Sequence, residues 1–222
     1  MNQAVMDRSV PFLMMLVSDA LLLCAFASLF IVARRRYSPA AKALRQGTVR
    51  FAKRDFDGAI KEFSRGIELQ PRSSQLYYGR AVARHFKGDL RAALCDYTRC
   101  IALDEKCVLA YEGRGLAKSR LGALEKAIAD YTKALALCPG LADCYCNRGT
   151  AKYRLRDYAG AIADFDLALG IDPKHAAACA NRGTVRHMAG DFDGAIVDYD
   201  RASQLNQSKE QHAWTEEIMP KI

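Results

Sequence analysis

The stretch Asp57-Gly-Ala-Ile-Lys-Glu-Phe63 decides the fold of this chain, because versions of it return every 34 residues. The later versions are Arg91-Ala-Ala-Leu-Cys-Asp-Tyr97, Glu125-Lys-Ala-Ile-Ala-Asp-Tyr131, Gly160-Ala-Ile-Ala-Asp-Phe165 and Gly194-Ala-Ile-Val-Asp-Tyr199. Five copies follow one another without an insertion. A fixed period of this length is typical of stacked copies of one supersecondary unit, none of which buries its apolar face alone.

Each unit is expected to contain two helices. In the third unit, Ala127, Tyr131 and Leu135 follow the spacing of an amphipathic helix. An upstream helical stretch ends at Gly122, a residue type that readily takes the left-handed conformation of a helix end. Aspartates that can cap the second helix, and prolines that can stop it, recur in the units: Asp55, Asp89, Asp157, Asp191, Pro71, Pro139 and Pro173. The pattern therefore predicts an all-α solenoid of helix hairpins.

A second pattern runs through the units in the order aromatic, small, alanine, aromatic, small, proline. The third and fourth units carry it as Tyr111, Gly115, Ala127, Tyr131, Ala134, Pro139 and as Tyr145, Gly149, Ala161, Phe165, Ala168, Pro173. Over roughly residues 40–207 the chain resembles the tetratricopeptide repeat family, with mild departures at Ala43, Glu105, Cys179 and Gln207. The resemblance implies a right-handed α-solenoid that binds proteins or peptides and carries no cofactor.

The predicted organisation has an N-terminal tail, a transmembrane helix, a basic spacer, five repeats and a capping helix. Their ranges are 1–9, 10–33, 34–39, 40–73, 74–107, 108–141, 142–175, 176–209 and 210–222. The capping helix is expected because Ser208-Lys-Glu-Gln211 has the spacing of a capping box. Its apolar residues, Trp214 among them, would cover the exposed end of the stack.

The segment Val10 to Ala33 is long and apolar enough to span a membrane. Asp19 is its only strongly polar residue, and whether Asp19 pairs with another transmembrane helix stays open. Eight basic residues and no acidic one follow between residues 34 and 54, beginning with Arg34, Arg35 and Arg36. Basic residues are retained in the cytosol. We therefore expect a single-pass membrane protein with its N-terminus outside and its repeats cytosolic.

Two other interpretations stay open. The triplet Ala25-Phe-Ala27 resembles a signal-peptidase site, and cleavage there would give an exported periplasmic adaptor. The chain could also be a structural subunit of a membrane complex, held by its transmembrane helix. The sequence does not identify the partner, the organism, the membrane or the oligomeric state.

No motif in the chain predicts catalysis or metal binding. The sequence lacks a glycine-rich phosphate loop, a nucleophile elbow and a pair of histidines at ligand spacing. Of the eight cysteines, Cys100 and Cys179 stand in positions expected to face the core, which favours structural thiols. We therefore expect a binding protein and not an enzyme.

The resemblance to tetratricopeptide repeats implies that the binding surface is the concave wall, which the first helices line. Its predicted contact residues are Phe51, Tyr78, Val82, His85, Phe86, Glu112, Leu116, Arg120, Cys146, Tyr153, Arg154, His187 and Met188. Aromatic and arginine side chains suit a groove that takes a peptide. Relatives that grip acidic chaperone tails use a clamp of basic and amide residues, of which only Asn147 is present, so a chaperone tail is disfavoured.

Basic residues also recur at pairs four apart on the first helices: Arg50, Arg80, Arg84, Arg114, Lys118, Arg148, Lys152, Arg182 and Arg186. Such a row could suggest a nucleic-acid track. The second helices, however, carry acidic residues with the same period, namely Glu62, Asp96, Asp130, Asp164 and Asp198. The equal periods predict ion pairs between helices, and nucleic acid is not expected as a partner.

Overall fold

The computed structural model describes residues 38–218, and within that range it is built of five antiparallel helix pairs. The first helices are α2 (Pro39–Ala52), α4 (Ser74–Lys87), α6 (Val108–Arg120), α8 (Ala142–Arg154) and α10 (Ala176–Met188). The second helices are α3 (Phe56–Leu69), α5 (Leu90–Leu103), α7 (Leu124–Leu137), α9 (Tyr158–Ile171) and α11 (Phe192–Ile218). The described range holds helices and turns without a strand, so the predicted all-α solenoid is confirmed.

Between residues 38 and 218, no helix combines the length and the hydropathy that crossing a membrane requires. The predicted transmembrane helix, 10–33, and the basic residues 34–36 lie outside the described range.

Local sequence signals set the helix ends. Ser38 accepts a hydrogen bond from the Ala41 backbone N–H, and Pro39 occupies the first turn of α2. The predicted aspartate caps are confirmed, because their carboxylates accept from the backbone N–H three residues later at 2.9–3.2 Å: Asp55, Asp89, Asp157 and Asp191. The turn inside each pair needs a positive φ, which is 83° at Gly122 and 64° at Arg156. Glycine suits this position, whereas arginine is strained there.

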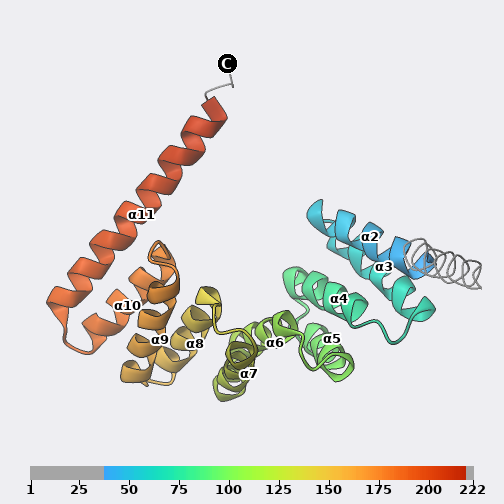
Figure 1. The fold of residues 1–222 in the computed structure, drawn as a ribbon, viewed down its shortest axis with the longest axis horizontal. Coiled ribbons are helices and arrows are strands. Elements are labelled where there is room, and N and C mark those ends of the chain that lie inside the picture. The colour runs from blue at the N-terminus through green and yellow to red at the C-terminus, as the bar shows by residue number, and fades with distance from the viewer. Residues whose placement is uncertain (1–37, 219–222) are drawn as a thin grey trace, which may run out of the picture.

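The first helices form the inner wall of the solenoid. Each packs on its own second helix, and consecutive first helices also contact each other: α2 with α4, α4 with α6, α6 with α8 and α8 with α10. Within the described range, second helices of successive repeats do not pack in this way. The pairs therefore follow an arc that runs from α2 to α11 (Figure 1).

The core consists of columns, meaning sets of residues 34 positions apart. The alanine and aromatic columns of the second helices are buried in repeats 1–4: Ala59, Ala93, Ala127, Ala161, Phe63, Tyr97, Tyr131 and Phe165. Tyr199, the fifth aromatic, is 41% exposed because no later repeat covers it. Cys100 and Cys179 are fully buried, which confirms that their columns face the core.

The C-terminal end differs from the prediction. Helix α11 continues without a break from Phe192 to Ile218, so a separate capping helix beginning near Ser208 is wrong within the described range. No glycine or proline occurs between Gly194 and Pro220, and nothing in that sequence stops the helix. In Figure 1 the C-terminal half of α11 extends beyond the other helices.

The predicted ion pairs between first and second helices are confirmed. We call them the charge ladder. Asp164, in repeat 4, accepts hydrogen bonds from Nε and Nη2 of Arg148 at 2.9 and 2.7 Å, and Lys152 Nζ lies 2.8 Å away. Repeats 2, 3 and 5 use the sets Arg80–Asp96–Arg84, Arg114–Asp130–Lys118 and Arg182–Asp198–Arg186. Each buried aspartate therefore has two cationic partners.

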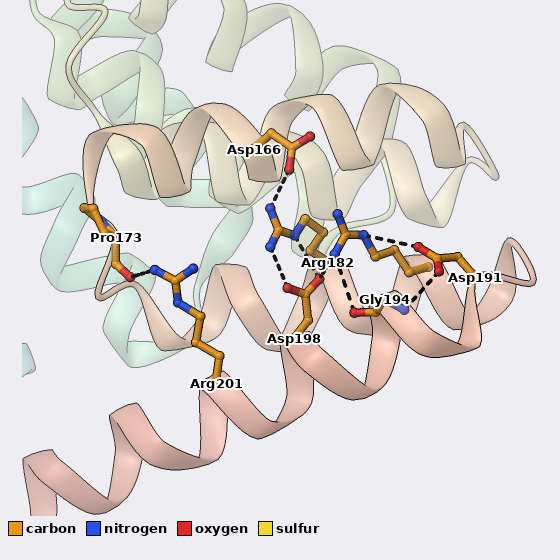
Figure 2. Close-up of polar contacts among 8 residues, drawn as sticks. Asp166, Pro173, Arg182, Asp191, Gly194, Asp198 and Arg201 are labelled. Atoms are coloured by element: carbon orange, nitrogen blue, oxygen red, sulfur yellow. Dashed lines mark hydrogen bonds and ion pairs between the residues drawn. The ribbon is translucent and has the colours of Figure 1, made fainter.

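The ladder also joins successive repeats. The remaining guanidinium nitrogen of Arg182, Nη1, donates to Asp166 on α9 of the preceding repeat at 2.6 Å (Figure 2). In repeats 2–4 the corresponding arginine donates to a hydroxyl of the preceding second helix: Ser64, Thr98 and Thr132. One bidentate side chain thus fixes three helices, which limits how the repeats can slide.

Repeat 1 departs from the ladder. Gln46 stands where the other repeats carry the bidentate arginine. Arg50 bonds to the cap residue Asp55 at 2.8 Å and approaches Glu62 only to 3.9 Å. One Glu62 oxygen is buried without a hydrogen bond among the described residues. The ladder is therefore incomplete at the N-terminal end of the stack.

Candidate functional site

A cavity of about 690 Å³ opens on the inner wall where the first three repeats meet. It is lined mainly by apolar side chains. Its lining residues are Leu44, Thr48, Phe51, Phe63, Ser74, Gln75, Tyr78, Gly79, Val82, Cys100, Asp104, Cys107 and Leu109. Pockets of this size and composition suit a bulky apolar group.

Two close contacts shape the floor of the cavity. A Cβ at Gly79 would lie 2.8 Å from the Phe63 ring, so only glycine lets α4 approach that ring so closely. The Tyr78 ring packs on Tyr97 with centroids 6.2 Å apart. Burial raises the pKa of Tyr78, so its hydroxyl is neutral at physiological pH.

Three of the predicted wall residues meet in this cavity: Phe51, Tyr78 and Val82. Phe51 also belongs to a cluster with Phe56 and Phe86, whose ring centroids lie 5.3–6.0 Å apart. Phe86 is largely exposed at the edge of that cluster. The N-terminal part of the predicted surface is therefore a continuous aromatic region.

Glu112 and Leu116 lie one repeat further along, on α6. Glu112 continues the column of Leu44 and Tyr78, the two cavity residues on α2 and α4. It is half-buried, and desolvation followed by the charge of Asp143 raises the pKa of its carboxyl group. Leu116, one turn later, is exposed.

His85 is a correction to the predicted surface. Its side chain is only 7% exposed, so it is unavailable as a surface contact. It lies at the end of α4, where its ring packs near Phe86. Burial, and then the charge of Arg120, lowers the pKa of His85. Arg120 itself is exposed.

The remaining predicted residues lie in repeats 4 and 5, away from the cavity. Tyr153 and His187 pack on the first residue of the following helix, Tyr158 and Phe192, with centroids 6.0 and 5.3 Å apart. Arg154 donates to the Ser119 carbonyl at 2.9 Å. Cys146 is buried and accepts from the Asn181 amide at 3.7 Å, and Met188 is exposed. These residues do not share the site of Phe51, Tyr78 and Val82.

The sequence analysis missed several residues of the cavity. Leu44 could have been found, because it stands 34 residues before Tyr78. Asp104, Cys107 and Leu109 come from the turn between repeats 2 and 3 and the start of α6. The period predicts the position of that turn, but the residue types in it differ from repeat to repeat, so the sequence does not indicate that they line a cavity.

The chemistry of the site fits recognition. Cys100 lines the cavity, and burial raises the pKa of its thiol to about 12, so this thiol stays protonated and is a poor nucleophile. Among residues 38–218, no cluster of three or more metal-ligating side chains occurs. The apolar cavity and its aromatic rim can hold a side chain of a partner.

Comparisons with known proteins agree with the fold. A crystal structure of MamA superposes with a TM-score of 0.69 at 22% identity, covering 74% of this chain and 96% of that one. The thermophilic TPR protein TTC0263 of Thermus thermophilus gives 0.61 at 21% identity, with 75% and 91% covered. YrrB, described as a TPR protein with an unusual peptide-binding site, gives 0.65 at 15% identity, with 85% and 98% covered. A search of curated proteins found no match.

Family models match the sequence directly. One described as "TPR repeat" matches residues 119–155. Another, described as "Tetratricopeptide repeat", matches residues 44–99 and 146–210, more than half of the chain. With the five helix pairs and their constant register along the chain, this match shows that the chain belongs to the tetratricopeptide repeat family.

Proposed function

We propose that this protein is a membrane-anchored scaffold that binds a peptide segment of a partner protein on the inner wall of its repeats, at the cytosolic face. The observation that carries the binding proposal is the apolar cavity between repeats 1–3. Leu44, Phe51 and Val82 supply apolar contact area, and Tyr78 adds a polar group. Such a preformed pocket binds without first having to order its own residues.

The charge ladder supports this proposal indirectly. It connects each repeat from 2 to 5 to its predecessor, so the wall that carries the cavity keeps one curvature. The basic residues of the first helices are also engaged within the protein, because each arginine of the charge ladder bonds a buried aspartate. These residues are therefore unavailable as a track for nucleic acid.

The membrane anchor rests on the sequence. Residues 10–33 form a 24-residue segment in which Asp19 is the only strongly polar residue, and the basic residues follow directly at 34–36. This arrangement favours a cytosolic position for everything after residue 36. The anchor would confine the encounter with the partner to the membrane surface.

The binding proposal is tested by filling the cavity. In Thr48→Trp, an indole replaces an exposed hydroxyl at the cavity wall. Thr184→Trp, in the same column of repeat 5, is the matched control. A library of displayed 12-residue peptides is selected on the full-length chain in lipid nanodiscs. Peptides should be enriched on the wild type and on Thr184→Trp but not on Thr48→Trp; equal enrichment on all three would contradict the proposal.

The topology is tested separately. A C-terminally tagged full-length chain is expressed in bacteria, and intact cells are treated with protease. The tag should be protected at full mass in intact cells and digested after lysis. A mature chain beginning at Ser28 in the periplasm would support the exported adaptor instead.

A further inference from the structure

Glu112 differs from the other buried or half-buried carboxylates of the stack. Asp96, Asp130, Asp164 and Asp198 each have two cationic partners. Glu112 has neither a hydrogen bond nor an ion pair within the part of the chain that the structure describes. It is also the one charged member of its column, which otherwise reads Leu44, Tyr78, Cys146 and Ala180.

The surroundings of Glu112 provide no internal cation among the described residues. Its strongest charged neighbour is Asp143, another carboxylate, which pairs with His175 at 3.0 Å. The basic residue two positions later, Arg114, points to Asp130 and lies over the Tyr111 ring. A half-buried carboxylate without a partner costs free energy that a bound cation can recover.

Three tyrosine rings lie beside this part of α6: a Cβ at Gly113 would lie 2.6 Å from the Tyr97 ring, one at Gly115 2.8 Å from the Tyr131 ring, and the Tyr78 ring packs on Tyr97. Besides desolvation, the charge of the carboxylate contributes to the raised pKa values of Tyr78, Tyr97 and Tyr131. The Tyr131 hydroxyl is buried and has no hydrogen-bond partner among the described residues. Carboxylate and tyrosine groups together are a common environment for an ammonium or guanidinium group.

The cavity and Glu112 lie next to each other on the inner wall. Tyr78 lines the cavity and occupies the position on α4 that Glu112 occupies on α6, and these two helices are in contact. Neighbouring packed helices are about 8–10 Å apart. An extended peptide advances about 3.3 Å per residue, so about three residues of peptide span this distance.

We propose that the inner wall recognises a peptide segment in which a bulky apolar side chain fills the cavity and a lysine or arginine, about three residues away, pairs with Glu112. This inference rests on the proposed function, because it names the chemistry of the peptide that the wall binds. Charge complementarity supports it: the protein carries a net charge of +8, yet this part of the wall has two carboxylates, Glu112 and the cavity residue Asp104.

The test compares peptide selections on three full-length proteins in nanodiscs: wild type, Glu112→Lys and Asp143→Asn. Thermal unfolding by circular dichroism first establishes that each variant is folded. The wild-type pool should be enriched in lysine or arginine about three residues from a bulky apolar residue, and the Asp143→Asn pool should agree with it. The Glu112→Lys pool should instead be enriched in aspartate or glutamate at that position.

A second measurement does not depend on reversal of the charge. A selected peptide and its lysine-to-glutamine analogue are titrated against wild type and Glu112→Gln by fluorescence anisotropy. Glu112→Gln should weaken the lysine peptide about tenfold, as expected for loss of a charge-assisted hydrogen bond. The affinity of the glutamine analogue should not change.

The outcomes separate this inference from the proposed function. One outcome is that peptides bind only when the cavity is open, as Thr48→Trp tests, but have the same charge preference on wild type and on Glu112→Lys. This outcome would overturn the inference and leave the proposed function standing. If no peptide is enriched on the wild type, both fail. Self-association of the wild type that Glu112→Lys abolishes, without peptide enrichment, would make a second copy of the chain the occupant and would also overturn the inference.

Discussion

The charge ladder and the inner wall place carboxylates in contrasting surroundings. On the ladder, Asp164 is almost fully buried and bonded by Arg148 and Lys152. On the wall, Glu112 is half-buried and has no cation beside it within the described residues. The ladder charges fix one repeat to the next, whereas the wall charge contributes nothing to that packing. A charge that the fold does not use is available to a ligand.

The largest expected effect comes from breaking the ladder. Asp164→Asn leaves Arg148 and Lys152 without a counter-charge, and removal of one partner of a buried ion pair costs about 3–5 kcal/mol. The free energy of unfolding is measured by urea denaturation. Glu62→Gln is the control, because Glu62 lies 3.9 Å from Arg50, a side chain that is 49% exposed. This substitution should lower the free energy of unfolding by less than about 1 kcal/mol. Equal costs would show that the ladder is not a set of buried pairs.

The next effect separates the two basic positions of the ladder. Arg182 bonds both oxygens of Asp198 and reaches Asp166, so Arg182→Lys keeps the charge but loses the bidentate geometry (Figure 2). We expect the loss of these hydrogen bonds to lower the free energy of unfolding by about 1–2 kcal/mol.

Arg186→Lys is the matched control for Arg182→Lys. Repeats 3 and 4 already carry lysine in that column, as Lys118 and Lys152, so its cost should be close to zero. Urea unfolding of both variants measures the difference. An equal loss for both would argue that net charge, not geometry, holds the repeats in register.

The helix caps form a third class, in which a carboxylate serves a single backbone group. Asp157 accepts from Gly160 N–H at 2.9 Å, and Asp157→Ala should cost about 1 kcal/mol. Repeat 3 has Ala123 in this column, and α7 begins without a side-chain cap. Ala123→Asp should therefore stabilise the protein by a similar amount, measured as a rise in the urea midpoint. No gain would mean that α7 does not need the cap.

The features that repeat every 34 residues could be predicted from the sequence. The caps, the core columns and the ladder each depend on residues of one type at one position, and contacts between equivalent helices follow from the period. The cavity depends on Asp104 and Cys107, which lie in a turn, and on the distance between α2 and α4. The 34-residue period predicts neither this distance nor the part that these turn residues play. The sequence pattern assigns His85 to the wall, and neither its helix nor its column indicates that its ring is buried.

The C-terminal helix shows a different limit. The capping-box spacing at Ser208 predicts the start of a helix, but a new helix can start only where the preceding helix stops. Gln207 replaces the proline that follows the second helix in repeats 1, 3 and 4, and α11 continues to Ile218. Local signals therefore predict a boundary only where a helix breaker accompanies them.

The smallest expected effect concerns the unpaired carboxylate itself. The folded pKa of Glu112 is raised by desolvation and by Asp143, so the folded state binds a proton more tightly than the unfolded state does. Between the ordinary pKa of glutamate and this raised value, stability should fall as pH rises. The groups that sense this charge are Asp143 and Cys144 on α8, Tyr78 on α4, Tyr97 on α5 and Tyr131 on α7.

Glu112→Gln removes this titration, so the difference in unfolding free energy between the variant and the wild type isolates it from all other carboxylates. The variant should gain stability relative to the wild type as the pH rises above the ordinary glutamate value, and the gain should level off above the folded pKa. We expect the gain to be smaller than the effect of a helix cap, because Glu112 is partly solvated. A difference that stays constant with pH would mean that Glu112 is fully hydrated, and would remove the reason for assigning it a cationic ligand.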